Sequence, residues 1–241
     1  SAATGSGKTV AFSLPLIKNL KPRSFAVQAL VLCPTRELAG QVADEIRRLA
    51  KYPGNIKVLT LCGGMPIGPQ IGSLAHGAHV IVGTPGRISD HLRKKTLDLA
   101  EVNTLVLDEA DRMLDMGFLA DIEKLSLAMK QKHQTLMFSA TYSNKVKSLA
   151  TQLLSTPKIL GVSKQNSTSG KVKQSVYWVS EARKRELLSE LIGVNNWQQV
   201  LVFAGTKESA NELANELKLD GITATLCHGD KTKGARNKAL S

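Results

Sequence analysis

Short runs of apolar and β-branched residues alternate along this chain with stretches whose apolar residues recur at helical spacing. In the N-terminal part the sequence predicts strands over residues 29–33, 57–62, 79–82, 104–108, 135–139 and 158–162. Helices are predicted over residues 36–52, 117–129 and 144–154. Such alternation is typical of an α/β fold with a parallel sheet covered on both faces, in which ligands bind at the carboxyl ends of the strands.

The polar stretch 163–171 lacks periodicity and is predicted to be a linker between a first domain, 1–162, and a second domain, 172–241. After the linker the alternation restarts. Strands are expected over 174–179, 200–204 and 223–227, and helices over 182–192 and 207–219. The sequence ends inside a further helical pattern, so we expect an incomplete second domain that is marginally stable and prone to pairing through its exposed sheet edge.

Composition narrows the classes of function. With 241 residues, 42% of them hydrophobic, the chain can bury one large core or two modest ones. Its formal net charge of +12 favours a polyanionic partner, although many basic proteins bind no nucleic acid. Cys33, Cys62 and Cys227 lack metal-ligand and CxxC spacing, which predicts buried free thiols in a reducing cytosol. There is no stretch of membrane-spanning length and no signal peptide, so we expect a cytoplasmic protein without a membrane partner.

Residues 1–9, Ser-Ala-Ala-Thr-Gly-Ser-Gly-Lys-Thr, have the pattern of a phosphate-binding loop. The glycines allow a tight turn whose N–H groups face phosphate oxygens, the lysine adds a positive charge, and the last threonine suits Mg²⁺. The apolar stretch 10–17 predicts a helix whose N-terminus faces the phosphates. The usual pattern has glycine in place of Ala2, and no strand precedes the loop, so we expect the chain to begin inside a domain. The candidate nucleotide-binding residues are Ala3, Thr4, Gly5, Ser6, Gly7, Lys8 and Thr9.

An acidic motif, Asp108-Glu-Ala-Asp111, directly follows the apolar run 104–107 and so stands at the end of a predicted strand. There Asp108 can hold Mg²⁺ through water, and Glu109 can polarise an attacking water. A solvated acidic turn explains the bare tetrapeptide equally well, but a phosphate loop upstream favours catalysis. The predicted catalytic residues are Glu109, Asp108 and Lys8, and the predicted magnesium ligands are Thr9 and Asp108.

Four shorter motifs also stand at predicted strand ends. Pro34-Thr-Arg-Glu-Leu-Ala39 opens a helix with Thr35 as its N-cap, and Thr84-Pro-Gly-Arg87 makes a turn before another helix. An arginine beside a helix N-terminus suits an external phosphate in both motifs, although helix capping alone explains the first. Gly63-Gly64 lets the backbone approach closely, either to a ligand or merely to another turn. By itself, Ser139-Ala-Thr141 carries little information.

Taken together and in this order, the motifs resemble those of the DEAD-box ATP-dependent RNA helicases, and the resemblance covers nearly the whole chain. Residues 25–118 are most similar to the bacterial DbpA branch, and residues 200–240, with His228-Gly-Asp-Lys231, to the RhlE branch. The resemblance implies a RecA-like P-loop NTPase domain followed by a truncated second RecA-like domain.

The resemblance also implies roles for individual residues. The chain is expected to bind ATP and Mg²⁺ and to couple hydrolysis to local separation of RNA strands or to remodelling of RNA–protein complexes. Asp111, Ser139 and Thr141 would link the nucleotide site to strand separation. A sequence-independent and salt-sensitive grip on the RNA backbone is implied. The RNA-binding residues carried over are Pro34, Thr35, Arg36, Gly64, Thr84, Pro85, Gly86, Arg87, Thr206, Gly229 and Asp230.

This sequence departs from the family pattern at Lys233, where relatives have glutamine. The segment that recognises adenine would precede residue 1, and the arginine fingers would follow Ser241. Since an arginine finger contributes about 10³–10⁵ in rate, we expect residues 1–241 to hydrolyse ATP very poorly. We also expect them to bind nucleotide weakly and to unwind negligibly. Two other functions stay open: an ATP-driven RNA clamp without unwinding, and a P-loop ATPase that acts on DNA or protein.

Overall fold

The structure is a computed structural model that describes residues 7–52, 54–129, 132–161 and 172–240. The chain divides into two compact units, Ser1–Thr168 and Ser169–Ser241, which we describe separately. The predicted linker 163–171 lies outside the described residues, so the domain boundaries stay a prediction.

The first unit is built on a five-stranded parallel sheet with the strand order β2-β3-β1-β4-β5. The strands are β1 (Ala29–Leu32), β2 (Val58–Leu61), β3 (Val80–Gly83), β4 (Thr104–Leu107) and β5 (Gln134–Met137). The helices are α1 (Lys8–Lys18), α2 (Arg36–Ala50), α3 (Ile67–Ala75), α4 (Pro85–Arg93), α5 (Ala110–Asp115), α6 (Leu119–Ala128) and α7 (Asn144–Leu153). The expected α/β fold with a parallel sheet is therefore confirmed.

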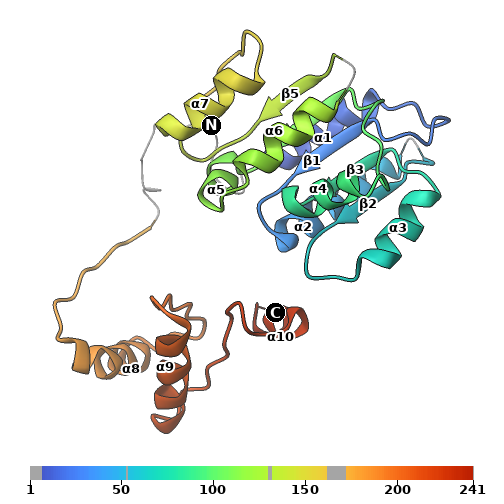
Figure 1. The fold of residues 1–241 in the computed structure, drawn as a ribbon. Helices are drawn as coiled ribbons and strands as arrows, with labels where there is room; N and C mark the ends of the chain where they lie inside the picture. Colours follow the sequence, from blue (N-terminus) through green and yellow to red (C-terminus); the bar gives the residue numbers. More distant parts are fainter. Residues whose placement is uncertain (1–6, 53, 130–131, 162–171, 241) are drawn as a thin grey trace. The chain divides into compact units, whose positions relative to one another are not determined.

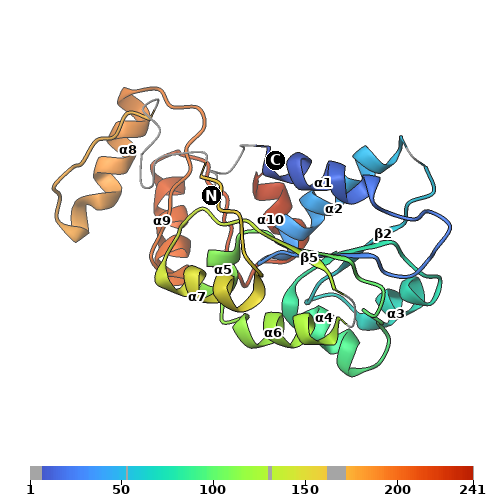
Figure 2. The ribbon, with the colours of Figure 1, turned by 90° about the horizontal axis from the view of Figure 1, so that it is seen from above.

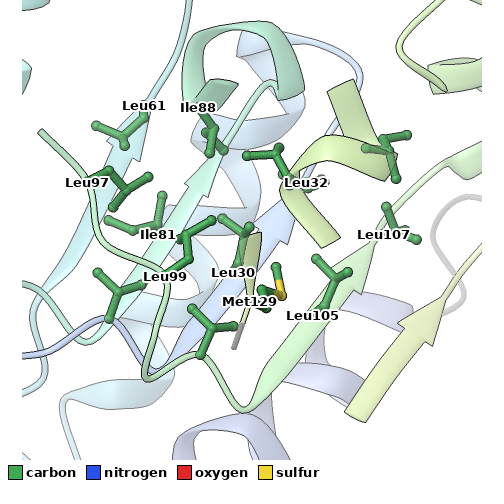
Figure 3. Packing of buried hydrophobic residues seen from close by; sticks show 14 of the residues in the cluster. Leu30, Leu32, Leu61, Ile81, Ile88, Leu97, Leu99, Leu105, Leu107 and Met129 are labelled. Atoms are coloured by element: carbon green, nitrogen blue, oxygen red, sulfur yellow. The ribbon is translucent and has the colours of Figure 1, made fainter. Parts of the chain in front are cut away.

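Helices cover both faces of this sheet (Figures 1 and 2). Alternate residues of each strand point to opposite faces, so a continuous apolar strand feeds two cores. Leu30 and Leu32 of β1 belong to the core under α4, α5 and α6, part of which Figure 3 shows. Ala29 and Val31 belong to the opposite core, under α1 and α2. Burial on both faces explains why these strands read as unbroken apolar runs.

Five predicted strands are confirmed, with ends shifted by one or two residues. The sixth predicted strand, 158–162, is wrong over its described residues, 158–161. Residues 158–161 form no strand, and Ile159 and Leu160 are strongly exposed. An apolar run becomes a strand only when a neighbour accepts its backbone hydrogen bonds and buries its side chains. The predicted helix 117–129 begins two residues later, at Leu119, because Gly117 in a left-handed conformation separates it from α5.

The second unit contains a 3₁₀ turn (Glu181–Arg183) and the helices α8 (Lys184–Val194), α9 (Lys207–Leu219) and α10 (Lys233–Leu240). The predicted helices are confirmed, but the predictions of strands over 174–179, 200–204 and 223–227 are wrong. None of these described segments forms a β-ladder. Among the described side chains of this unit only Leu217 is buried, whereas Trp178 and Phe203 are almost fully exposed. Without a core to cover a sheet face, the extended segments do not pair.

The cysteines partly follow the expectation. Cys33 and Cys62 are buried and belong to no disulfide, but Cys227 is exposed because it lies in one of the unpaired segments of the second unit. No helix in the described part of the chain is long and apolar enough to cross a membrane.

Candidate functional site

The phosphate-loop lysine and the acidic motif meet at one hollow of the first unit. A cavity of about 340 Å³ lies between the start of α1, the face of α2 and the end of β4. Its lining residues are Gly7, Lys8, Thr9, Val10, Leu38, Gln41, Val42, Glu45, Asp108 and Glu109. Residues 100 positions apart in the sequence thus share one site, as expected for groups at the carboxyl edge of a parallel sheet.

The start of α1 gives the cavity its positive side. Gly7 takes a left-handed conformation, with φ of 78°, and its carbonyl oxygen accepts the first helical hydrogen bond, from Ala11 at 3.0 Å. Lys8 and Thr9 therefore stand in the first turn, where the backbone N–H groups have no helical partner and the helix dipole attracts anions. The other candidate nucleotide-binding residues, Ala3, Thr4, Gly5 and Ser6, lie outside the described residues.

Asp108 and Glu109 form the acidic side. The Asp108 Oδ1 atom accepts a hydrogen bond from the Glu109 N–H at 3.1 Å, and Arg112 holds the Glu109 carboxylate at 3.4 Å. Glu109 has a left-handed backbone, with φ of 52°, although it is not glycine. Such strain is uncommon and tends to occur at functional sites, where the fold imposes it. Here it turns the chain sharply from β4 into α5.

Burial sets the electrostatics of this acidic side. Asp108 is 3% exposed, and its burial raises the pKa of the carboxyl group, an effect that Lys8 opposes and Glu109 reinforces. Burial also raises the pKa of the neighbouring Cys33 thiol well above its ordinary value, and the negative charge of Asp108 adds to the shift. A buried carboxylate of this kind is relieved by a cation.

The oxygen ligands present fit Mg²⁺. This ion prefers oxygen donors and usually combines one or two protein ligands with water and substrate phosphates. Asp108 and Thr9, which line the same cavity, supply a carboxylate and a hydroxyl of this type. The described residues contain no cluster of three or more His, Cys, Asp or Glu side chains that could bind a metal without substrate.

The sequence did not indicate two of the lining residues, Gln41 and Glu45, as part of the site. They project from α2 into the cavity beside Leu38 and Val42, with the i, i+3, i+4, i+7 spacing of one helix face. Arg48 pairs with Glu45 at 2.6 Å and lowers the pKa of that carboxyl group. The periodicity of α2 could have shown that these polar residues share a face with core residues, but not that this face meets the phosphate loop.

Asp111, Ser139 and Thr141 form a second group. One oxygen of Asp111 accepts hydrogen bonds from both the N–H and the hydroxyl of Thr141, each at 2.9 Å. Ser139 donates to the Thr141 carbonyl at 2.7 Å. Burial acts to raise the pKa of Asp111, but these donors outweigh it and the pKa lies below its ordinary value. The structure thus brings the three predicted coupling residues together, and one of them, Asp111, is two residues after Glu109 in the chain.

A third group lies at the ends of β1, β2 and β3. Gly64 has a φ of 70°, and the Arg36 guanidinium lies so close that a Cβ at position 64 would be 2.1 Å from Nη1. Arg87 donates from Nη1 to the Met65 carbonyl at 2.9 Å. The Gly63-Gly64 turn is therefore flanked by two arginines from different helices.

The remaining predicted RNA-facing residues of this unit sit at helix starts. Thr35 caps α2 by accepting a hydrogen bond from the Leu38 N–H at 3.3 Å, and Pro34 precedes it. Thr84 occupies the N-cap position of α4 and donates its N–H to the Leu61 carbonyl at 3.1 Å. Pro85 and Gly86 open that helix. Both helix N-termini therefore lie at the carboxyl edge of the sheet, where they attract anions.

In the second unit the candidate residues gather around Lys207. Thr206 and Ser209 make a capping box at the start of α9, and Lys207 forms an ion pair with Asp230 at 2.6 Å. A Cβ at position 229 would lie 3.8 Å from the Lys207 side chain, and His228 contacts Asn211 at 3.3 Å. Thr206, Gly229 and Asp230 thus share one small region, while Lys233, the departure from the family pattern, begins α10.

Comparison with known proteins decides the family. Residues 1–149 match the family model for the DEAD/DEAH box helicase. This chain belongs to the DEAD/DEAH box helicase family. The DEAD-box chain is 43% identical over 239 residues to the ATP-dependent RNA helicase DbpA of Escherichia coli, covering 99% of this chain and 52% of that protein. It is 41% identical to the DEAD-box ATP-dependent RNA helicase CshA of Bacillus licheniformis, covering 99% and 49%. The chain spans about half the length of these curated relatives.

Solved structures give the same family and confirm the RecA-like fold. The DEAD-box chain matches a DEAD box protein from the hyperthermophile Methanococcus jannaschii with 40% identity and a TM-score of 0.63, covering all of this chain and 64% of that one. It also matches Saccharomyces cerevisiae Dbp5 bound to RNA and ADP BeF3, with 30% identity and a TM-score of 0.86, covering all of this chain and 61% of that one.

Proposed function

We propose that this chain is the nucleotide- and RNA-binding part of an ATP-dependent RNA helicase that separates short RNA duplexes or remodels RNA–protein complexes. The observation that carries the proposal is the cavity where Lys8, Thr9, Asp108 and Glu109 converge. Family membership, relatives named as ATP-dependent RNA helicases, and a structural neighbour bound to RNA and ADP BeF3 support it. The three cysteines form no disulfide, which is typical of proteins in a reducing cytosol and favours a cytoplasmic location.

Four residues of the cavity, Lys8, Thr9, Asp108 and Glu109, have roles in ATP hydrolysis that follow from their positions. The first turn of α1 and Lys8 hold the phosphates, since N–H dipoles and an ammonium group both stabilise negative charge. Thr9 and Asp108 would hold Mg²⁺, and the bound ion would neutralise part of the phosphate charge. Glu109 orients the attacking water and accepts its proton, with Arg112 fixing the direction of its carboxylate.

In this proposal, the residues that bind the RNA backbone belong to the third group, at the ends of β1, β2 and β3. Arg36, Arg87 and the N-termini of α2 and α4 offer positive charge and N–H donors to phosphates. Arg87 uses one guanidinium N–H on Met65, and a guanidinium has five donors in all. Because bases are not read by such contacts, binding should be sequence-independent and should weaken steeply with salt.

Coupling between the two sites runs through Asp111 in this proposal. Asp111 follows Glu109 in the chain, and Thr141 binds it with two hydrogen bonds. A change of conformation around the γ-phosphate would move Asp111 and with it the segment after β5. In this proposal, such a movement is how ATP binding would alter RNA binding.

Nucleotide binding is tested with Lys8→Ala and, as a matched control, Lys18→Ala at the exposed C-terminal end of the same helix. Binding of a fluorescent ATP analogue should weaken about tenfold or more for Lys8→Ala, because a charged hydrogen bond contributes about 1.5–3 kcal/mol. Lys18→Ala should bind normally. Equal affinity for the two variants would contradict the proposed nucleotide site.

Helicase and clamp functions are separated with the protein expressed from its complete open reading frame. ATP-dependent displacement of a strand from a short RNA duplex supports the helicase, whereas ATP-dependent retention of RNA without displacement supports the clamp. Stimulation of ATP hydrolysis by DNA as strongly as by RNA of equal length would favour the third alternative, because the 2′-hydroxyl is what distinguishes the two.

A further inference from the structure

Two buried polar side chains lie beneath the Gly63-Gly64 turn and belong to none of the three groups above. Gln70 on α3 is 8% exposed, and His91 on α4 is completely buried. Burying an amide or an imidazole costs free energy unless its polar atoms find partners. Their hydrogen-bond partners therefore indicate what these side chains do.

The partners form one continuous relay. The Gln70 amide nitrogen donates to the Cys62 carbonyl at 3.1 Å, and the His91 Nε2 atom lies 3.2 Å from the Gln70 amide oxygen. Thr96 Oγ1 lies 2.9 Å from His91 Nδ1. Since the Gln70 nitrogen is used on Cys62, its oxygen accepts from His91 Nε2–H. The neutral ring can accept from the Thr96 hydroxyl, whose single hydrogen also has the His91 carbonyl oxygen within reach at 3.2 Å.

The charge state of His91 agrees with this order of protons. Burial lowers the pKa of the His91 ring, and the positive charges of Arg87 and Lys94 add to the effect while Asp90 opposes it. The ring is therefore neutral at neutral pH, with one donor and one acceptor. Each side chain of the relay has at least one hydrogen-bond partner, and a buried polar network with partners of this kind favours a single conformation.

The relay ends on the turn that the two arginines flank. Gln70 holds the carbonyl of Cys62 on one side of Gly63-Gly64, and Arg87 holds the carbonyl of Met65 on the other. Between these anchors the left-handed Gly64 meets the Arg36 guanidinium. Residues of α3 and α4 thus hold the two ends of the turn together.

We propose that Gln70 and His91, steadied by Thr96, are positioning residues that hold the Gly63-Gly64 turn so that Arg36 and Arg87 can bind a common phosphate of a single RNA strand. This inference rests on the proposed RNA-binding function and adds residues that do not touch the RNA. Preorganisation is the physical reason: a turn already fixed in its binding conformation loses less conformational entropy when the strand binds.

The main test is Gln70→Met, which keeps the size of the side chain but removes both hydrogen bonds. Gln152→Met on the exposed face of α7 is the matched control. Affinity of the 241-residue chain for a labelled single-stranded oligouridylate is measured by fluorescence anisotropy across a series of KCl concentrations. We expect Gln70→Met to bind the RNA about five- to tenfold more weakly. The reason is that the Cys62 carbonyl loses its hydrogen-bond partner and the Gly63-Gly64 turn is no longer anchored.

The salt dependence separates positioning from a structural role. Loss of one common phosphate contact should lower the slope of log affinity against log salt by about 0.7, whereas a merely less stable fold leaves the slope unchanged. Amide exchange of Gly63 and Gly64 should also accelerate in Gln70→Met. Folded Gln70→Met with unchanged RNA affinity and an unchanged slope would overturn the inference, whereas a wild-type chain that binds no RNA would overturn the proposed function itself.

A second variant, Thr96→Val, cuts the far end of the relay without touching the turn. We expect RNA binding to weaken about two- to threefold, because His91 loses one neutral hydrogen bond. In the double variant Thr96→Val should add nothing to Gln70→Met, since the relay is already broken. Additive losses would show that Thr96 acts elsewhere and would refute the relay, and Thr96→Val alone decides the question if Gln70→Met does not fold.

Discussion

Gly64 shows how much can depend on one missing side chain. Its left-handed backbone is costly for other residues, and the space that a Cβ would need is filled by the tip of Arg36. In the sequence, Gly63-Gly64 indicates only a place where the backbone is approached closely. The structure identifies the group that approaches as an arginine from a different motif.

Gly64→Ala should therefore displace Arg36 in addition to straining the backbone. We expect a loss of about 1–2 kcal/mol in the free energy of unfolding, measured with denaturant. RNA affinity should fall about three- to tenfold, measured by anisotropy, because a charged hydrogen bond to phosphate is weakened. Gly117→Ala is the control, since Gly117 is also left-handed but has open space around its Cβ position. If Gly117→Ala weakens RNA binding equally, displacement of Arg36 is not the cause.

At the scale of elements, the link between α5 and the segment after β5 depends on one carboxylate. Asp111 and Thr141 are 30 residues apart in the sequence and are joined by two hydrogen bonds. These bonds lower the pKa of Asp111 below its ordinary value of 3.8, so the ionised form is favoured in the folded state. The stability they add is fully present above the unfolded pKa and is lost as the pH falls through the folded pKa.

Thr141→Val removes the hydroxyl donor and keeps the N–H donor. We expect the pKa of Asp111 to rise toward its ordinary value, followed by NMR titration of the carboxyl carbon. The free energy of unfolding should fall by about 0.5–1 kcal/mol at neutral pH, with a difference from wild type that shrinks as the pH falls below 3.8. Thr151→Val on the exposed side of α7 is the control, because Thr151 bonds only to helix carbonyls of its own helix. A pH-independent loss for Thr141→Val would show that the hydroxyl does not act through Asp111.

At the scale of the whole molecule, the two units differ in how completely they bury their apolar residues. The first unit has two cores on opposite faces of its sheet. In the second unit Leu201 is 70% exposed, and it stands within an unpaired apolar segment that reads as a strand. Exposed segments of this kind pair readily with other chains.

Leu201→Lys should consequently reduce self-association of the chain. We expect a smaller oligomeric fraction over a range of protein concentrations, measured by sedimentation velocity, because a charge opposes strand pairing at the segment. Leu127→Lys is the control: Leu127 is 87% exposed but lies on the helix α6, where no extended edge is available. Equal association of the wild type and Leu201→Lys would contradict this view of the second unit.

Local signals in the sequence predicted much of the fold. The predicted strands that end at Cys33 and Asp108, and the N-cap Thr35, placed β1, β4 and the start of α2 within a residue. The same signals overpredicted strands at 200–204, because β-branched composition does not provide a neighbour. For the site, the motifs indicated Lys8, Asp108 and Glu109 but not Gln41 or Gln70, whose roles depend on which helix face meets which strand end.

The sequence alone therefore determined the chemistry: a phosphate loop, a pair of carboxylates at a strand end, and arginines at two helix starts, each recognisable because its residue types and spacing are local. Tertiary structure decided which of these groups meet. The strand order β2-β3-β1-β4-β5 places the ends of β1, β2 and β3 beside one another, so that Arg36 reaches Gly64 and Arg87 reaches Met65. Strand order depends on packing between segments far apart in the chain, and no local pattern encodes it.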